Sequence, residues 1–178
     1  MSIDIPKFVF VILLSSSLRT VSSNSKSYSY VSANAEYKHN FFSELKITAR
    51  NGSMDIVVKT LKDFTSDPWV SVLVVMRPSK NAKNRTLLHY DINVCKILGK
   101  QATNFISTWL QNYFRLGNMP SECPIKKGNY SWCNLRPDML KMPLFFSKGQ
   151  YIAHTSLYFK KRKTMDSLAN ITTVMEVK

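Results

Sequence analysis

The sequence predicts a mainly β protein, a two-sheet antiparallel β-sandwich that carries one amphipathic helix. Apolar residues recur with a period of two along most of the chain, as they do in half-buried strands. Seven or eight such runs follow one another at short spacing, which is typical of a sandwich. With 178 residues, 44% of them hydrophobic and 20% charged, the composition is that of an ordinary globular chain.

The first 23 residues have the anatomy of a secretory signal peptide. Lys7 precedes an apolar run over residues 8–14, and Val21-Ser22-Ser23 fits a small-residue cleavage site, with residues 15–17 as a second possibility. The run is much shorter than the roughly 20 residues that a membrane-spanning helix needs. We therefore expect residues 24–178 to form one secreted, extracellular domain; an uncleaved anchor or a buried strand is the alternative.

Four Asn-x-Ser/Thr sequons are candidate glycosylation sites in that compartment. They begin at Asn51, Asn84, Asn129 and Asn170. The surroundings of Asn51 and Asn84 are polar and turn-like, whereas Asn170 opens a strand-like run.

The first predicted hairpin lies between residues 44 and 58. Residues 44–50 and 54–58 alternate between apolar and polar side chains, and Asn51-Gly52-Ser53 between them is a tight-turn signal.

Three further groups of strands follow. Residues 69–76 are nearly all apolar, which predicts a central strand covered on both faces. Residues 88–94 alternate again after the polar link 79–85. Residues 151–159 and 171–177 form a last pair, joined by a polar link that contains Lys160, Lys161, Arg162 and Lys163.

The helix is predicted at about residues 97–116, where apolar side chains recur at steps of three and four. Gly117 is a natural stop signal. An aromatic stripe of Phe105, Trp109 and Tyr113 is expected to face the sheets.

Three cysteines in an oxidising compartment indicate one disulfide and one remaining thiol. A bond between Cys95 and Cys123 would tie the helical segment to the sheet, and a bond between Cys123 and Cys133 would close a short turn instead. Cys133, beside Trp132, could also be a buried thiol. A catalytic role for Cys133 is not expected, because no histidine lies near it in the sequence.

Catalytic and metal-binding signatures are absent from the sequence, so we expect neither an enzyme nor a cofactor. His39, His89 and His154 do not form a metal-binding motif, and the chain has no glycine-rich phosphate loop. The net charge of +14 would suit nucleic acid, but a signal peptide and sequons argue against that partner. The basic run at residues 160–163 is interpreted as a solvated hairpin tip, or as a guide toward anionic surfaces.

Three motifs in order carry a family resemblance: residues 91–98 (Asp-Ile-Asn-Val-Cys-Lys-Ile-Leu), residues 123–130 (Cys-Pro-Ile-Lys-Lys-Gly-Asn-Tyr), and Met142-Pro143-Leu144 followed by Gly149-Gln150-Tyr151. Over about residues 28–178 the chain resembles a large secreted insect family, domain-of-unknown-function family 1091, which is related to the ML (lipid-recognition) superfamily.

The resemblance implies an immunoglobulin-like β-sandwich with an apolar cavity between its sheets. It implies binding of lipids or other hydrophobic molecules, and a chemosensory role in some insect members. Cys95 and Cys123 match the cysteines of the family motifs, which supports pairing them. This chain lacks the additional N-terminal cysteines of many members and carries the extra Cys133.

The leading hypothesis is therefore a non-catalytic carrier or sensor of a hydrophobic small molecule or lipid. Phe145 and Phe146, two of the candidate cavity residues named below, could control access at the mouth of the cavity instead of lining it. The alternative is an interaction module that binds a receptor or an anionic membrane surface through its basic face, without a small ligand. The candidate cavity residues are inward-facing positions on the predicted strands, the helix and the loop before residue 149: Val72, Val74, Met76, Tyr90, Ile92, Phe105, Trp109, Phe145, Phe146, Tyr151, Leu157 and Phe159.

Overall fold

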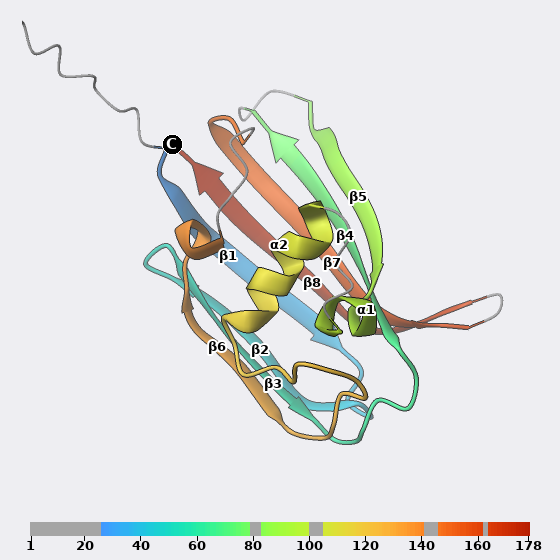
Figure 1. The fold of residues 1–178 in the computed structure, drawn as a ribbon. Helices are drawn as coiled ribbons and strands as arrows, with labels where there is room; N and C mark the ends of the chain where they lie inside the picture. The colour runs from blue at the N-terminus through green and yellow to red at the C-terminus, as the bar shows by residue number, and fades with distance from the viewer. Residues whose placement is uncertain (1–25, 79–82, 100–104, 141–145, 162–163) are drawn as a thin grey trace, which may run out of the picture.

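Two antiparallel sheets of unequal width face each other across the core (Figure 1). The computed structural model describes residues 26–78, 83–99, 105–140, 146–161 and 164–178, and only the backbone of Phe105. The predicted signal peptide lies outside these residues. The wider sheet has five strands in the order β1 (Tyr28–Tyr37), β8 (Met165–Val177), β7 (Gly149–Lys160), β4 (Pro68–Arg77) and β5 (Arg85–Asn93).

The narrower sheet has three strands, and one helix extends the layer that it forms. The strands are β2 (Phe42–Arg50), β3 (Ser53–Thr60) and β6 (Asn129–Leu135), in that order. Helix α2 (Phe105–Arg115) lies across the wider sheet beside them (Figure 1). The predicted two-sheet antiparallel β-sandwich is therefore confirmed.

The predicted hairpin is formed by β2 and β3, with Arg50 opposite Ser53 at the turn. Asn51 has a φ of 51° and Gly52 a φ of 78°. A two-residue turn of this kind needs positive φ at both central positions, which Asn and Gly adopt more readily than other residues. The turn also meets β1, because the Tyr30 amide donates a hydrogen bond to the Gly52 carbonyl at 3.0 Å.

A bulge in β1 determines which of its side chains face the core. The register between β1 and β8 shifts between Tyr30 and Ser32. Because side chains alternate along a strand, the extra residue lets Tyr30 and Ala33 share the inner face, while Val31 is 51% exposed. Sequence periodicity did not identify this strand.

The single helix predicted at about 97–116 is wrong in its extent, because two helices occupy this region. The first, α1 (Val94–Leu98), begins where the Asn93 side chain accepts a hydrogen bond from the Lys96 amide at 3.0 Å. Gly99 ends it, and glycine is a poor helix former. Ile97 of α1 and Leu110 of α2 pack in the same cluster. The apolar spacing therefore continues across two separate helices.

The central strand predicted at 69–76 is confirmed as β4, but it is not covered on both faces. Val72 and Val74 are buried on the inner face. On the outer face Leu73 is half-buried and lies between His89 and His154 of the neighbouring strands. In Figure 1 none of the described elements lies over this face.

The disulfide joins Cys95 to Cys123, with their Cα atoms 5.5 Å apart. The bond connects α1 to the segment that leads into β6. It therefore fixes both ends of the 28-residue segment that contains α2. Closing a loop of this length contributes roughly 3–4 kcal/mol in the chain-entropy account. Cys133 is exposed on β6, so the expectation of a buried thiol is wrong.

Gly117, just after α2, allows a close approach between the helix end and β6. A Cβ atom at this position would lie 2.5 Å from the Trp132 ring and 2.7 Å from the Ser131 carbonyl oxygen. Only a residue without a side chain fits there. In the part of the chain described, no helix has the length and apolar character needed to cross a bilayer.

We predict that replacing both Cys95 and Cys123 with Ser lowers the free energy of unfolding by roughly 3–4 kcal/mol, because the unfolded chain regains its loop entropy. Urea denaturation measures the change. The matched control, Cys133→Ser, should stay within about 0.5 kcal/mol of the natural protein. Recovery of a Cys123–Cys133 peptide under non-reducing conditions would contradict the assignment.

We also predict that Gly117→Ala lowers the free energy of unfolding by roughly 1–3 kcal/mol, because the added methyl group collides with the Trp132 ring. Gly128→Ala is the control, since a Cβ atom there would meet Tyr130 at an ordinary 3.4 Å. Equal stability of the two variants, measured by thermal unfolding, would be inconsistent with the close approach.

Candidate ligand cavity

An apolar cavity of about 290 Å³ lies between the two sheets and α2. The wider sheet supplies one wall from the inner faces of β1, β4, β5, β7 and β8: Tyr30, Val70, Val72, Val74, Leu88, Tyr151, Ala153, Thr155, Leu157, Ala169, Ile171, Thr173 and Met175. The volume of the cavity is close to the lower end of the roughly 300–1,000 Å³ typical of small-molecule sites.

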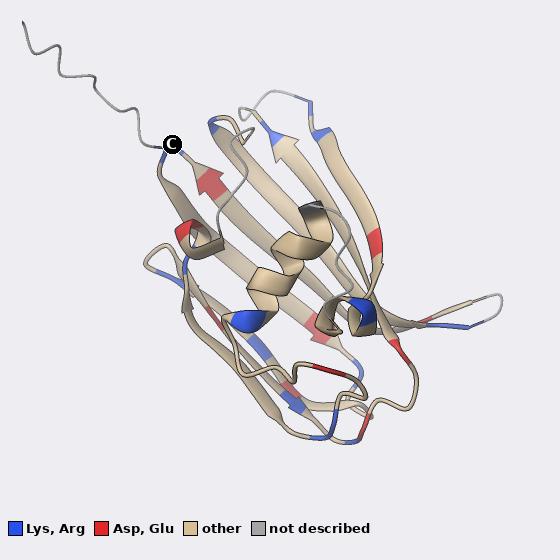
Figure 2. Cartoon of the chain, in the orientation of Figure 1, with Lys and Arg blue, Asp and Glu red and all other residues tan. Residues whose placement is uncertain are grey.

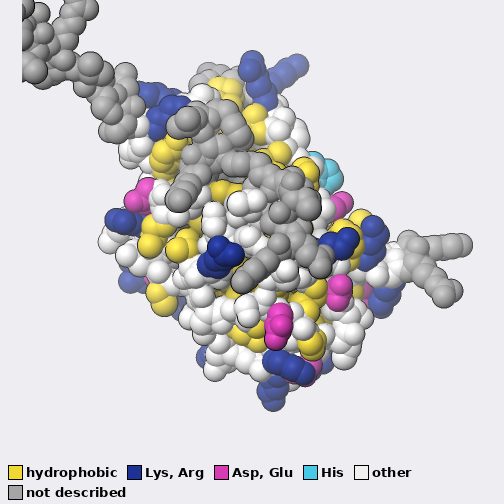
Figure 3. Space-filling model, viewed as in Figure 1, with side chains coloured by type: hydrophobic (Ala, Val, Ile, Leu, Met, Phe, Trp, Pro, Cys, Tyr) yellow, Lys and Arg dark blue, Asp and Glu magenta, His cyan; other side chains and the backbone are white. Residues whose placement is uncertain are grey.

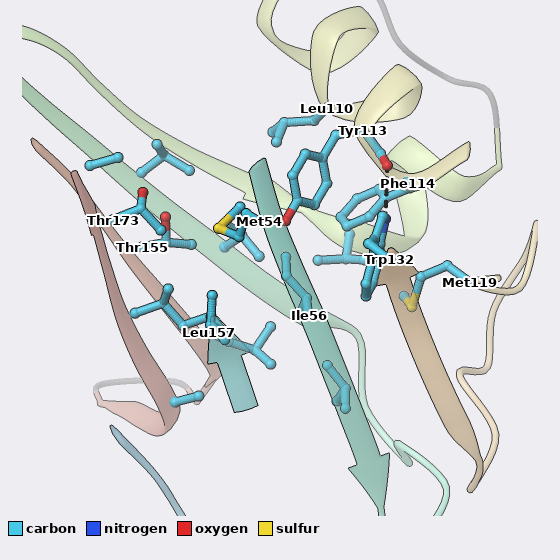
Figure 4. A pocket seen from close by; sticks show the side chains of 18 of the residues that line it. Met54, Ile56, Leu110, Tyr113, Phe114, Met119, Trp132, Thr155, Leu157 and Thr173 are labelled. Carbon is cyan, nitrogen blue, oxygen red and sulfur yellow. Dashed lines mark hydrogen bonds between the residues drawn. The ribbon is translucent and has the colours of Figure 1, made fainter. Parts of the chain in front are cut away.

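The opposite wall comes from the narrower sheet and the helix, some of whose side chains are shown in Figure 4. Its strand residues are Phe42, Leu45, Ile47, Met54, Ile56, Val58, Thr60, Tyr130 and Trp132. Helix α2 contributes Ile106, Trp109, Leu110, Tyr113 and Phe114. Segments around these elements add Phe64, Pro68, Val94, Met119, Ile125 and Phe146.

The middle of the wider sheet has the burial expected of a cavity wall rather than of a filled core. Ala153, Leu157 and Ile171 lie on the inner face of β7 and β8, yet they are only half-buried. Val177, on the same face near the end of β8, is 2% exposed. Side chains in a close-packed core lose nearly all their accessible surface. The remaining surface of the central residues faces the cavity.

The predicted cavity residues divide into three groups. Six of them line the cavity: Val72, Val74, Trp109, Phe146, Tyr151 and Leu157. Four lie elsewhere in the fold: Met76, Tyr90, Ile92 and Phe159. Phe145 and the side chain of Phe105 lie outside the described residues.

Packing accounts for the four that lie elsewhere. Ile92 is buried against Ile97 and Leu110, and Phe159 packs edge-to-face against Phe64 with ring centroids 5.6 Å apart. Met76 is half-buried beside the apolar cluster around Val74. Tyr90 faces inward opposite Val72, but β5 is the edge strand, which leaves the tyrosine 38% exposed.

Phe146 lies in the wall and is 6% exposed. Its ring packs against Tyr151 with centroids 4.7 Å apart. A gating role for the pair Phe145–Phe146 stays a prediction.

A hydrogen bond from β6 positions the helix wall. The Trp132 Nε1 donates to the Tyr113 backbone carbonyl at 2.9 Å, and the two rings lie 5.7 Å apart (Figure 4). The Tyr113 ring thereby extends between the sheets with its hydroxyl toward Met54 (Figure 4).

Sequence analysis did not select Tyr30, Met54, Thr155 or Thr173 as cavity residues, and it took Tyr113 only as part of the stripe. The strands that carry Met54, Thr155 and Thr173 alternate between apolar and polar residues, but no local signal indicates which inward-facing side chains lie opposite one another across the cavity.

The hydroxyl groups of the wall fall into two sets. Tyr151 donates to the Ser147 carbonyl at 2.7 Å, Tyr130 donates to the Lys126 carbonyl at 2.5 Å, and the Thr60 oxygen accepts from the Gly128 amide at 2.8 Å. Tyr30 and Tyr113 make no such bond with a described residue.

Burial raises the pKa of the Tyr30 hydroxyl well above its ordinary value. The pKa of Tyr113 is raised by burial and, to a smaller extent, by its electrostatic interaction with Tyr30. Both phenols are therefore neutral at physiological pH and able to donate or accept a hydrogen bond.

Formal charges lie outside the cavity. Lys and Arg occur mainly at strand ends and loops, and α2 carries only Arg115 at its last residue (Figure 2). On the surface in Figure 3, hydrophobic side chains form patches between polar and charged ones. His89 pairs with Ser71 and His154 with Thr172, at 3.2 Å each, on the outer face. The described side chains form no group able to hold a metal ion.

The basic hairpin between β7 and β8 projects from the body of the molecule (Figure 1). Lys160 places its Nζ 4.7 Å from the centre of the Trp69 ring. Lys161 and Lys38 both pair with Asp166, at 3.0 and 2.6 Å, and these hydrogen bonds lower the pKa of that carboxyl. Arg162 and Lys163 lie outside the described residues.

All four sequon asparagines are exposed, so each is accessible to a glycosylating enzyme: Asn51, Asn84, Asn129 and Asn170. The Asn170 side chain lies on the outer face of β8, where it accepts a hydrogen bond from Ser156 at 2.8 Å.

Residues 70–153 match the model of a family described as "Protein of unknown function (DUF1091)". The matched stretch runs from β4 into β7 and contains both disulfide cysteines. It supports the family resemblance carried by the sequence motifs. A search of the curated proteins finds no match to the chain.

We predict that Ala153→Leu leaves the free energy of unfolding unchanged or raises it by up to about 1 kcal/mol, because the added carbons fill the cavity. The control is Val177→Phe. Val177 is 2% exposed, packs in a buried cluster and does not line the cavity, so that variant should lose roughly 1–3 kcal/mol. Equal losses in urea denaturation would show that the space beside Ala153 is filled.

Proposed function

We propose that the mature protein is a secreted, non-catalytic binding protein that holds a hydrophobic small molecule or lipid between its sheets. The observation that carries this proposal is the apolar cavity, which has walls from both sheets and from α2. A sandwich filled with side chains would have favoured an interaction module instead.

The energetics of such binding are set by hydrocarbon burial. Each buried methylene contributes about 0.8 kcal/mol, so ten to twelve of them supply roughly 8–10 kcal/mol. Association costs several kcal/mol, which packing contacts beyond simple transfer must offset for the affinity to reach the micromolar range. Micromolar affinity corresponds to about −8 kcal/mol. A cavity of about 290 Å³ suits a ligand with one chain better than a complete two-chain lipid.

The composition of the wall suits chains of differing shape. Met54, Met119 and Met175 contribute flexible thioether side chains, which adapt to irregular apolar surfaces. Trp109 and Tyr113 add large, rigid apolar area from the helix.

Secretion is the other half of the proposal. The N-terminal segment, the exposed sequons and the Cys95–Cys123 disulfide support the proposal of an extracellular, glycosylated protein. From the resemblance we infer an insect source, a relation to the ML superfamily and a chemosensory role for the bound molecule.

The projecting basic hairpin supports a second candidate, an interaction module that binds a receptor or an anionic membrane surface. Met165 is 65% exposed on this hairpin, opposite Lys160. An exposed apolar side chain beside cations suits a membrane surface. This second candidate function requires no cavity. Nucleic acid is not proposed as a partner.

We predict that phenylnaphthylamine, an apolar fluorophore, binds with micromolar or better affinity and that raised salt changes this affinity little, because hydrocarbon burial is not screened. Val74→Glu should abolish binding by placing a charge in the wall; circular dichroism must first show that the variant folds. A titration followed by fluorophore emission and by Trp emission measures the affinity of the natural protein at each salt concentration and the affinity of the variant.

The discriminating control replaces the four basic residues 160–163 with Gln. This variant should bind phenylnaphthylamine with nearly unchanged affinity. If it loses binding while Val74→Glu retains it, the surface module replaces the carrier. Native mass spectrometry of protein from its natural source gives an independent check, because a carrier should retain a co-purifying apolar molecule.

A further inference from the structure

We infer that the ligand is an uncharged chain molecule with one oxygen-containing group, such as an alcohol or an ester, rather than a pure hydrocarbon or a carboxylate. This inference rests on the proposed function and concerns the polar atoms that the cavity presents.

The first observation is that some of the wall hydroxyls have no protein partner. Thr60, Tyr130 and Tyr151 use their hydroxyls in hydrogen bonds to the backbone. Tyr30 and Tyr113 form none with the described residues, although both pack against the buried cluster around Met54. Among the described side chains, the fully buried polar atom without a partner is Trp109 Nε1, also in the wall; the two tyrosine hydroxyls keep some accessible surface. Polar groups in an apolar wall are almost always hydrogen-bonded, so these unpaired hydroxyls point to an exchangeable partner.

The second observation is that these hydroxyls are gathered in one part of the cavity. Tyr30 lies at the β1 bulge and Tyr113 on α2, and they are close enough to interact electrostatically. Thr155 and Thr173, diagonal neighbours on β7 and β8, also have hydroxyls without a described partner. In Figure 4 the Tyr113 hydroxyl lies beside Met54, and Thr155 and Thr173 stand on the wider sheet, which faces it.

The third observation concerns charge. Among the described residues that line the cavity, none is Lys, Arg, His, Asp or Glu. A carboxylate entering this wall would lose its hydration without gaining a counter-ion, which strongly disfavours the charged form. A neutral oxygen, in contrast, needs only one or two hydrogen bonds, and neutral hydroxyls both donate and accept.

A displacement assay against phenylnaphthylamine tests the inference with four ten-carbon probes: decane, decanol, methyl decanoate and decanoate. The variant Tyr30→Phe with Tyr113→Phe removes the two hydroxyls and keeps the apolar rings. This double variant should bind decanol and methyl decanoate about two- to tenfold more weakly, which is the contribution of one hydrogen bond. Its affinity for decane should stay within about twofold of that of the natural protein.

Tyr151→Phe is the matched control, because it removes a wall hydroxyl that already bonds Ser147. This variant should change the affinities for decane, decanol and methyl decanoate by the same factor. Decanoate should bind more tightly as the pH falls from about 7.5 to about 5.5, by roughly tenfold per unit, because only the protonated acid enters.

The outcomes separate this inference from the function it rests on. If phenylnaphthylamine and all four probes fail to bind the folded natural protein, the carrier proposal fails. If they bind but the double variant weakens decane and decanol alike, the cavity is a ligand site and the head-group inference is wrong. Tight, pH-independent binding of decanoate would overturn it as well.

Discussion

The structure depends on one mismatch: a five-stranded sheet faces a sheet of only three strands. The apolar inner face of the wider sheet would meet water on the side that the narrow sheet does not reach. Helix α2 covers that area and is fixed there by three contacts: the Cys95–Cys123 disulfide upstream of β6, the Trp132–Tyr113 hydrogen bond and the close approach at Gly117. The cavity lies between the wider sheet and this layer of helix and strands.

This origin explains why the cavity wall is so varied. One side has small and branched strand residues, and the other has aromatic rings from α2 and β6. The same junction brings Tyr113 of the helix near Tyr30 of β1, far apart in the chain. The polar atoms of the cavity are therefore a product of the helix covering the sheet. They belong to the same arrangement that creates the space.

Charge is arranged separately from the cavity. The described ion pairs are on the surface, such as Lys59 with Glu44 and Lys126 with Asp63, where each contributes little to stability. The excess of Lys and Arg is distributed over strand ends and loops (Figure 2). The strong net positive charge therefore affects how the molecule approaches other surfaces, whereas the apolar interior governs what it can hold.

Local sequence determined the elements whose causes are local. The Asn51-Gly52 turn, the strand at Trp69–Met76 and the pair at the C-terminal end were predicted because turn chemistry and alternation need only neighbouring residues. The Cys95–Cys123 pairing came from the family motifs rather than from spacing. Tertiary structure alone decided that Ile92 and Phe159 enter the packed core, and that Tyr30 and Tyr113 lie close enough to interact electrostatically. These outcomes depend on the distance between layers, which the packing of distant segments sets, so no local pattern can encode them.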